Sequence, residues 1–138
     1  MAVTVKQVAI WRSEVAHRSG ELARVLRPIA EAGANLQVIM GYAEDDRGIV
    51  EICPISGKKV IEAAKKAGFA ASSKPTLLVQ GDDRAGLGYK IARAIADQGV
   101  SISFDVTQVI GKKFSAVYGF HSEEDAKAAA GAIRKAAR

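Results

Sequence analysis

The chain has 138 residues and a formal net charge of +5, and 49% of its residues are hydrophobic and 25% charged. This balance is typical of a globular protein and excludes a disordered or fibrous chain. No apolar run approaches the roughly 18 residues of a membrane span, and one cysteine with two histidines offers too few ligands for a metal site. We expect a soluble, cytoplasmic protein without a cofactor and without a membrane partner.

The positive charge is spread along the chain. Residues 1–70 contain ten Lys and Arg against eight Asp and Glu, and residues 71–138 contain ten against seven. Proteins that bind nucleic acids gather basic residues into a patch or tail, because these residues neutralise neighbouring phosphates. The simpler interpretation here is a mixed, solvated surface, so we do not expect a nucleic-acid partner.

Hydrophobic periodicity predicts a strand, a helix, two strands and a helix in the first half of the chain. The predicted elements are a strand at 5–11, a helix at 20–32, strands at 35–42 and 49–54 and a helix at 58–67. The first helix has one apolar stripe, formed by Leu22, Val25, Leu26 and Ile29. In the second strand apolar residues alternate, which is typical of a sheet covered on one face. The stretch 69–73 could add a short edge strand.

The second half repeats this order. The predicted elements are a strand at 76–81, a helix at 86–98, strands at 101–109 and 113–120, and a helix that begins after Ser122. Ser122 and the three acidic residues after it favour a helix start, because serine caps the first turn and carboxylates are stabilised at the positive end of the helix dipole. The second half lacks an evident final strand.

The two halves are also related residue by residue. Residues 20–37 align with residues 86–103 without a gap at a constant offset of 66, and five of these 18 positions are identical. The sequence therefore predicts two domains, 1–73 and 74–138, each a ferredoxin-like unit of the βαββα(β) type. The fold class is α+β, with antiparallel sheets and helices on one face of each sheet.

The loop before the first helix of each unit is the candidate site. A helix N-terminus presents unpaired N–H groups and partial positive charge, which suits a carboxylate, and glycine lets a ligand approach the backbone. Gly20 and Gly86 occupy this position, each two residues after an arginine. The nearby carboxylates of Asp82, Asp83 and Glu14 could hold an ammonium group, so both charges of an amino acid would be matched. Alternatively, Ser19 and Asp83 are ordinary helix caps.

Residues 83–102, Asp-Arg-Ala-Gly-Leu-Gly-Tyr-Lys-Ile-Ala-Arg-Ala-Ile-Ala-Asp-Gln-Gly-Val-Ser-Ile, resemble the first loop, helix and second strand of an ACT domain. Residues 19–22 and 33–36 resemble the same pattern more loosely. The resemblance covers almost the whole chain and implies a non-catalytic regulatory module that binds a small ligand, usually an amino acid, where two such domains meet. In that family the ligand contacts the first loop and the start of the second strand. The matching positions are Ser19, Gly20, Glu21, Leu22, Asn35 and Leu36, together with Asp83, Ala85, Gly86, Leu87, Ser101 and Ile102.

The chain departs from the family's pattern in two ways. The family often has proline where Ser19 and Ala85 stand, and the second copy lacks an evident last strand. These departures leave open that one of the two pockets is altered or absent. Modules of this type commonly regulate an enzyme, so the resemblance implies an enzyme as the regulated partner, and we expect a homo-oligomer.

An RNA-recognition motif shares this order of elements and is the main alternative. It stacks bases on aromatic residues of its first and third strands. Ala116 and Gly119 stand where such rings are expected, and the first strand of this copy has no aromatic residue. Phe114, Tyr118 and Phe120 alternate along one strand, and we expect them to pack under the helices.

A small hydrolase is the least favoured alternative. A thiol nucleophile would need a base, and Cys53 with His17 or His121 is the one such combination in the sequence. Cys53 ends an apolar strand, where cysteine is usually a small buried hydrophobe. Arg18 and Asn35 could be imagined in acyl phosphate hydrolysis, but nothing in their spacing demands it. We therefore expect that this chain is not an enzyme.

Overall fold

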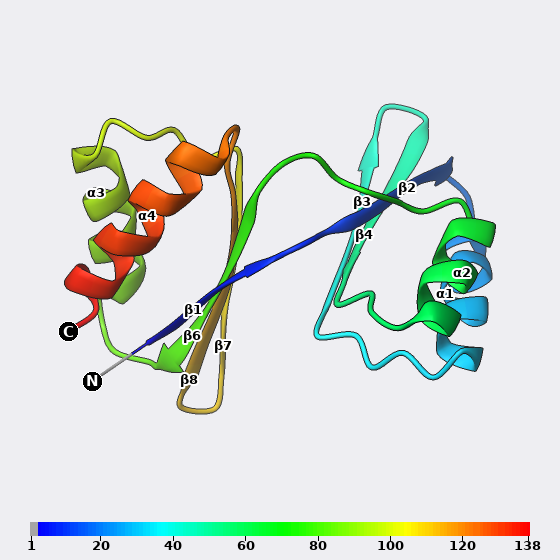
Figure 1. The fold of residues 1–138 in the computed structure, drawn as a ribbon, viewed down its shortest axis with the longest axis horizontal. Coiled ribbons are helices and arrows are strands. Elements are labelled where there is room, and N and C mark those ends of the chain that lie inside the picture. Colours follow the sequence, from blue (N-terminus) through cyan, green and yellow to red (C-terminus); the bar gives the residue numbers. More distant parts are fainter. Residues whose placement is uncertain (1–2) are drawn as a thin grey trace. The chain divides into compact units, whose positions relative to one another are not determined.

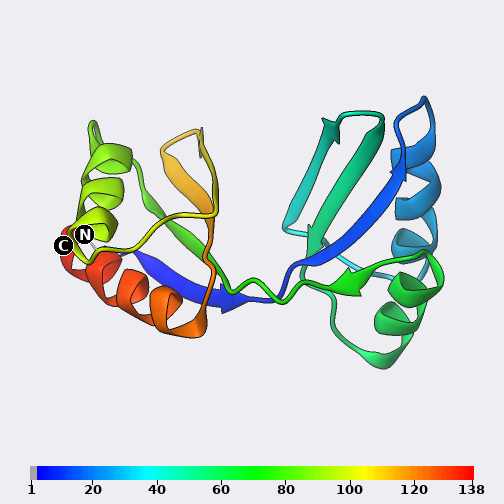
Figure 2. The same cartoon turned by 90° about the horizontal axis from the view of Figure 1, so that it is seen from above.

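The computed structural model describes residues 3–138, and the chain divides into two compact units. One unit is Ala9–Ser73, and the other combines the N-terminal segment through Val8 with Lys74–Arg138. Each unit has a four-stranded antiparallel sheet (Figure 1). Figure 2 shows that both helices of a unit lie on one side of its sheet. The predicted fold class of two α+β, ferredoxin-like units in tandem is confirmed.

The unit Ala9–Ser73 follows the order βαββαβ. Its elements are β2 (Trp11–Ala16), α1 (Glu21–Glu31), β3 (Val38–Glu44), β4 (Arg47–Cys53), α2 (Lys58–Lys66) and β5 (Ala70–Ala71). The strand order in the sheet is β3-β4-β2-β5. The short strand β5 pairs with Trp11 and Arg12 of β2, so the predicted edge strand is confirmed.

The second unit has the same kind of sheet, but its edge strand comes from the start of the chain. Its elements are β1 (Thr4–Val8), β6 (Thr76–Asp82), α3 (Leu87–Asp97), β7 (Phe104–Ile110), β8 (Lys113–Gly119) and α4 (Glu123–Ala136). The strand order is β1-β6-β8-β7, so β1 holds the place that β5 holds in the other unit. Ser122 caps α4 as predicted, since its Oγ accepts a hydrogen bond from the Asp125 N–H at 3.1 Å.

The predicted single strand at 5–11 is wrong, because these residues form two strands in two different sheets. Strand β1 pairs antiparallel with β6, from Thr4 opposite Gln80 to Val8 opposite Thr76, while β2 starts at Trp11. The physical reason is an open edge. The second unit ends in α4 without a last strand, and β1 pairs with the free edge of β6. The division into units differs from the predicted domains 1–73 and 74–138, because the N-terminal segment through Val8 lies with Lys74–Arg138.

The cores lie between each sheet and its helices. Helix α1 buries Val25 and Ile29 against Val50 and Ile52 of β4. In the second unit Phe114, Tyr118 and Phe120 are at most 2% exposed within the larger cluster under α3 and α4. The prediction that these rings pack under the helices is confirmed.

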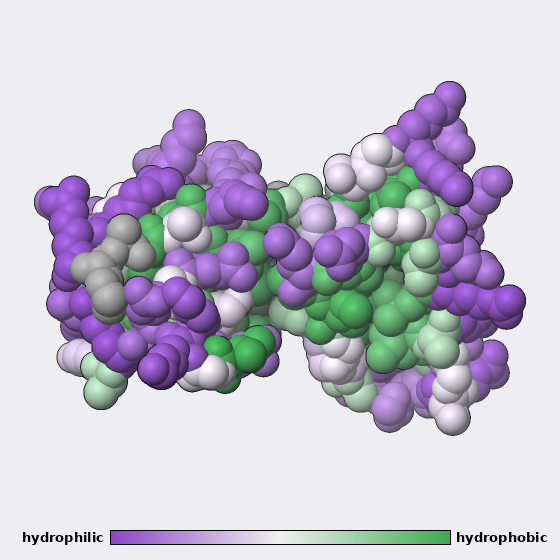
Figure 3. Space-filling view, turned by 90° about the horizontal axis from the view of Figure 1, so that it is seen from below, coloured by the Kyte–Doolittle hydropathy of each residue, from purple (hydrophilic) through white to green (hydrophobic). Residues whose placement is uncertain are grey.

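The surface mixes hydrophilic and hydrophobic side chains. On the face that Figure 3 presents, hydrophilic residues spread over both units with hydrophobic patches between them. Among residues 3–138, no helix is both long and apolar enough to cross a membrane. Within the same residues, no three His, Cys, Asp or Glu side chains gather in a way that could hold a metal ion.

Deleting residues 1–8 should selectively destabilise the second unit. The deletion leaves the N–H and C=O groups on one edge of β6 unpaired, and each lost backbone hydrogen bond costs about 0.5–1.5 kcal/mol. We expect faster amide hydrogen exchange in β6 and unchanged exchange in β2 and β4. Because the Arg134 side chain at the end of α4 donates to the Val5 carbonyl at 3.2 Å, the same segment joined after Arg138 by a short flexible linker should restore protection. Unchanged exchange in β6 after the deletion would contradict the assignment.

Candidate functional site

The two helix-start loops have the same layout. Strand β2 continues to Ala16, so the loop before α1 is residues 17–20, and the loop before α3 is residues 83–86. The predicted strand at 5–11 and helix at 20–32 imply a longer first loop, residues 12–19, between them. That prediction is wrong because residues 11–16 pair fully with β4. The constant offset of 66 therefore extends through both loops.

Each loop ends at a glycine that starts the helix. Gly20 and Gly86 are the N-cap residues, with φ of 87° and 79°, and neither cap position contributes a side-chain hydrogen bond. This left-handed backbone is cheap for glycine and strained for other residues. The alternative that Ser19 and Asp83 cap the helices is therefore wrong. The first turns of α1 and α3 keep N–H groups that no cap side chain satisfies.

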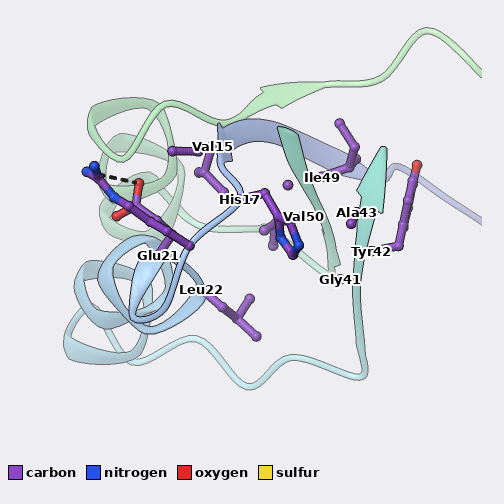
Figure 4. Close-up of a pocket in the computed structure, with 12 residues that line it drawn as sticks. Val15, His17, Glu21, Leu22, Gly41, Tyr42, Ala43, Ile49 and Val50 are labelled. Carbon is purple, nitrogen blue, oxygen red and sulfur yellow. Dashed lines mark ion pairs between the residues drawn. The ribbon is translucent and has the colours of Figure 1, made fainter. Parts of the chain in front are cut away.

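A pocket of about 270 Å³ lies at the start of α1 in the unit Ala9–Ser73 (Figure 4). It is bounded by the helix start, by the loop before it and by the sheet face beneath. The lining residues are Val15, Ala16, His17, Arg18, Glu21, Leu22, Gly41, Tyr42, Ala43, Gly48, Ile49 and Val50. The pocket is therefore built within one unit, from β2, α1, β3 and β4.

Two glycines, Gly41 and Gly48, lie in the floor of this pocket. Gly41 pairs with Val50, and Gly48 pairs with Ala43 on one side and Val15 on the other. A Cβ at Gly41 would meet no heavy atom nearer than the Leu22 Cδ2, at 4.0 Å. A Cβ at Gly48 would lie 3.0 Å from the Val15 Cγ2, so Val15 takes the space over Gly48. The open space between α1 and the sheet therefore lies over Gly41.

Leu22 does not join the core as its place in the predicted stripe suggested. It is 44% exposed, whereas Val25 and Ile29 of the same stripe are at most 1% exposed. In Figure 4 the Leu22 side chain projects from α1 beside the strand that carries Gly41. The open space over Gly41 explains this difference, because Leu22 has no side chain opposite it to pack against.

A carboxylate and two basic side chains border the pocket. Glu21 is 8% exposed, and its carboxylate accepts hydrogen bonds from Arg24 at 2.8 and 3.1 Å. The hydrogen bond from Arg24 lowers the pKa of Glu21, and the charges of Arg24 and Arg18 lower it further. The Arg18 guanidinium is 4.0 Å from Glu21 and 73% exposed. With His17 in the same loop, the rim offers both a fixed negative charge and accessible hydrogen-bond donors.

Tyr42 contributes its backbone and not its hydroxyl. In Figure 4 its ring points away from the helix, and its hydroxyl donates to the Glu51 carboxylate at 2.6 Å. Burial raises the pKa of Tyr42 to about 12, and the hydrogen bond to Glu51 adds to the effect. The inner wall of the pocket therefore has no tyrosine hydroxyl available to a ligand.

The structure brings together some of the sequence-predicted site residues. Glu21 and Leu22 line the pocket, and Ser19 and Gly20 belong to the loop at its edge. Asn35 and Leu36 follow the far end of α1, whose 11 residues span about 16 Å. Within one unit the helix start and the start of the second strand are thus separated by the helix. Leu36 also packs against the core.

The second unit has the same separation. Asp83, Ala85 and Gly86 are exposed at the start of α3, while Ser101 and Ile102 follow its far end. The Leu87 side chain is 2% exposed and belongs to the core. In this loop only backbone groups and exposed side chains are therefore within reach of a ligand.

Sequence reasoning missed the floor of the pocket. Val15 and Ala16 were assigned to a loop, and Gly41 and Gly48 were not considered for a binding role. One signal was present, because glycine inside a strand often marks a place where a ligand or another backbone comes close. The register that places both glycines under α1 follows from strand pairing and not from the local pattern.

Replacing Glu21 with Gln should show how far its charge stabilises the helix start. Because its pKa is below the ordinary 4.5, the ionised carboxylate stabilises the fold above that value. This contribution is lost as the pH falls through the folded-state pKa. The difference in Tm between wild type and Glu21→Gln should therefore be larger at about pH 7 than at about pH 3. Glu31→Gln, in an exposed pair with Arg27, is the matched control. A pH-independent difference for Glu21→Gln would contradict the assignment.

Comparisons with known proteins identify the fold. No protein-family model matches the sequence, and no curated protein shows significant sequence similarity. A solved structure from Bacteroides thetaiotaomicron has a TM-score of 0.76 and 17% identity, over 91% of this chain and 87% of that one.

Two regulatory subunits of aspartate kinase are also similar in structure. The subunit from Thermus thermophilus has a TM-score of 0.69 and that from Thermus flavus 0.61, each with 18% identity over 100% of this chain and 98% of the subunit. At these identities the similarity establishes a shared arrangement of elements across the whole chain. Together with the two ferredoxin-like units observed here, it shows that the chain has the fold of a tandem ACT-domain protein.

Proposed function

We propose that this chain is a non-catalytic regulatory module that binds an amino acid at the start of α1. The observation that carries the proposal is the pocket in the unit Ala9–Ser73, which combines an uncapped helix N-terminus, Arg18 and Glu21 at its rim and an apolar floor. Its volume of about 270 Å³ lies just below the range of drug-sized sites, about 300–1,000 Å³. A ligand of amino-acid size suits such a volume.

The rim matches the two charges that all amino acids share. The Arg18 guanidinium can donate two parallel hydrogen bonds to an α-carboxylate, and the first-turn N–H groups of α1 add partial positive charge. Glu21 stays ionised near neutral pH because its pKa is lowered, so it can accept from an α-ammonium group. Arg18 and Glu21 are only loosely paired at 4.0 Å, and the Arg18 side chain is 73% exposed, so it can move away from Glu21 to hold the carboxylate of a ligand.

The regulatory part of the proposal rests on the fold. Two of the similar structures are described as regulatory subunits of aspartate kinase, and this chain covers almost their full length. We propose that the chain acts on an enzyme, which is its partner, and that ligand binding changes this interaction. We also propose that the chain works as a homo-oligomer in the cytoplasm.

The surroundings of Cys53 support a non-catalytic role. Cys53 is 1% exposed, and burial raises the pKa of its thiol. A nucleophilic cysteine needs the opposite, an accessible thiolate with a lowered pKa. A thiol mechanism therefore has no support in the described part of the chain.

An RNA-binding role is disfavoured by the position of the aromatic residues. Base stacking needs rings on an accessible sheet face. Phe114 and Tyr118 instead lie on the face of β8 that α3 and α4 cover. Strand β8 corresponds to the third strand of an RNA-recognition motif. Its aromatic rings are buried in the core and are not accessible to bases.

The proposal can be tested by calorimetry and thermal shift with the twenty amino acids. We expect saturable binding of one amino acid or a small set, and a ligand at 100 times its Kd should add about 2.7 kcal/mol of stability. Binding of none of the twenty, together with tight and salt-sensitive binding of single-stranded RNA, would favour the RNA-binding alternative.

Arg18→Ala should weaken binding without affecting the fold, because the side chain is 73% exposed. A hydrogen bond between charged groups is worth about 1.5–3 kcal/mol, so Kd should rise about tenfold to 150-fold. Arg27→Ala is the control, because Arg27 lies on the helix α1 that follows the loop, is 79% exposed and does not line the pocket. Equal affinities of the two variants would show that Arg18 does not hold the ligand.

A further inference from the structure

The second helices of the two units carry opposite charges at matching positions. Strand β3 matches β7, β4 matches β8 and α1 matches α3 over their whole lengths at the offset of 66. Continued beyond β4 and β8, the same offset places Lys58 and Lys59 of α2 on Glu124 and Asp125 of α4. The first turn of α2 is therefore basic where the first turn of α4 is acidic.

The start of α2 lacks the features that favour a helix start. Its N-cap is Gly57, so no side-chain hydrogen bond caps the first turn, and that turn has no acidic residue. In α4, by contrast, Ser122 caps the helix and the first turn holds three carboxylates. Because cations are disfavoured at the positive end of a helix dipole, Lys58 and Lys59 reduce the stability of α2. A local rule that is broken without a gain for the fold points to a functional surface.

The exposed face of α2 is strongly positive. Lys58, Lys59, Lys65 and Lys66 are all exposed, and Glu62 is the one acidic residue of the helix, so its net charge is +3. None of the four lysines forms an ion pair with another residue in the range 3–138. In α4 three basic residues balance three acidic ones. Helix α2 thus presents positive charge that the described residues do not neutralise.

An open groove of about 320 Å³ lies between α2 and the end of α1, which are neighbours in Figure 1. Its small lining side chains are Pro28 and Ala32 at the end of α1 and Ala63 of α2, and Lys59 and Lys66 line it from α2. Lys59, Ala63 and Lys66 follow the i, i+4, i+7 spacing of one helix face, and the two lysines are about 10 Å apart along the axis. The groove therefore combines a small apolar centre with two cations two turns apart.

Two carboxylates also line the groove. Glu31 is 3.5 Å from the Arg27 guanidinium, so its charge is balanced within α1. Glu62 lies between Lys59 and Lys66 along α2 and is the only acidic lining residue that has no ion pair within residues 3–138. The groove therefore keeps an excess of positive charge on its α2 side.

We infer that this groove is a docking surface for an acidic, amphipathic helix of a partner protein. The inference rests on the proposed function for the existence of a partner, and it adds the contact surface and the chemistry of that partner. Small or apolar residues of the partner helix pack against Pro28, Ala32 and Ala63. Two of its carboxylates, seven residues apart, pair with Lys59 and Lys66. An amphipathic helix laid in a groove is a recurring mode of protein recognition.

Charge and shape favour this occupant over others. A second copy of this chain carries the same net charge of +5, and like net charges oppose association. Phosphates of a nucleic acid or of a lipid surface would use all four lysines alike and would gain nothing from the small side chains in the groove. An acidic helix complements both the charge and the apolar centre.

The experiment is calorimetry of the full chain with a synthetic helical peptide of about 20 residues, which carries two glutamates seven residues apart beside a face of alanine and leucine. We expect saturable binding near neutral pH at an ionic strength of about 0.15 M. A variant with both Lys59→Glu and Lys66→Glu should raise the Kd about tenfold. The matched control with Lys58→Glu and Lys65→Glu has the same net charge and should bind nearly as wild type does. A peptide with lysines in place of its glutamates should bind the Lys59→Glu, Lys66→Glu variant more tightly than wild type.

Both variants should fold, because the substituted side chains are exposed and a carboxylate in the first turn of α2 stabilises the helix. Circular dichroism should show a Tm no lower than that of wild type. Four results would each overturn the inference: no binding of the acidic peptide, equal weakening in the two variants, tighter binding of single-stranded RNA or anionic lipid vesicles than of the peptide, or self-association of wild type that Lys59→Glu with Lys66→Glu abolishes. The amino-acid titrations test the proposed function separately, so its failure is distinguishable from failure of the docking surface.

Discussion

The pairing of β1 with β6 is the interaction on which the organisation of the chain depends. It joins Thr4–Val8 to Thr76–Gln80 by an antiparallel ladder, and side chains reinforce it, since Gln7 donates to the Glu123 carboxylate at 2.9 and 3.0 Å. An unpaired edge of β6 would expose backbone groups that favour aggregation. With β1 in place, both sheets have the same spatial order of strands. The edge strand comes first along the chain in the second unit, as β1, and last in the unit Ala9–Ser73, as β5.

This arrangement also determines where the first helix-start loop lies. Because residues 4–8 belong to the second unit, β2 starts only at Trp11 and runs to Ala16 along β4. The loop before α1 is then as short as the loop before α3. A short loop that ends in a left-handed glycine holds Arg18 and Glu21 close to the sheet, which gives the pocket a rim of defined charge.

The two units fill the region under the helix start with different side chains. The second unit buries Phe114 there, and replacing a buried Phe by Ala costs about 3–5 kcal/mol. The unit Ala9–Ser73 has Gly48 at the matching position, and the Val15 Cγ2 on the neighbouring strand lies 3.0 Å from where a Cβ on Gly48 would be. The counterpart of Val15 is Gly81, which pairs with Phe114. The large side chain of this strand pair is therefore on β2 in one unit and on β8 in the other.

The sequence by itself determined the repeat, the order of elements within it and the helix starts. The offset of 66 and the apolar stripe with Val25 and Ile29 are local patterns, and local patterns follow from the periods of helix and strand. Two features were decided only by the tertiary structure. The partner of residues 4–8 depends on a free edge about 70 residues away along the chain, and the floor of the pocket depends on the register that places Gly41 and Gly48 under α1. Strand partners and registers are set by which edges and faces must be covered in the folded molecule, so no local reading of the chain could supply them.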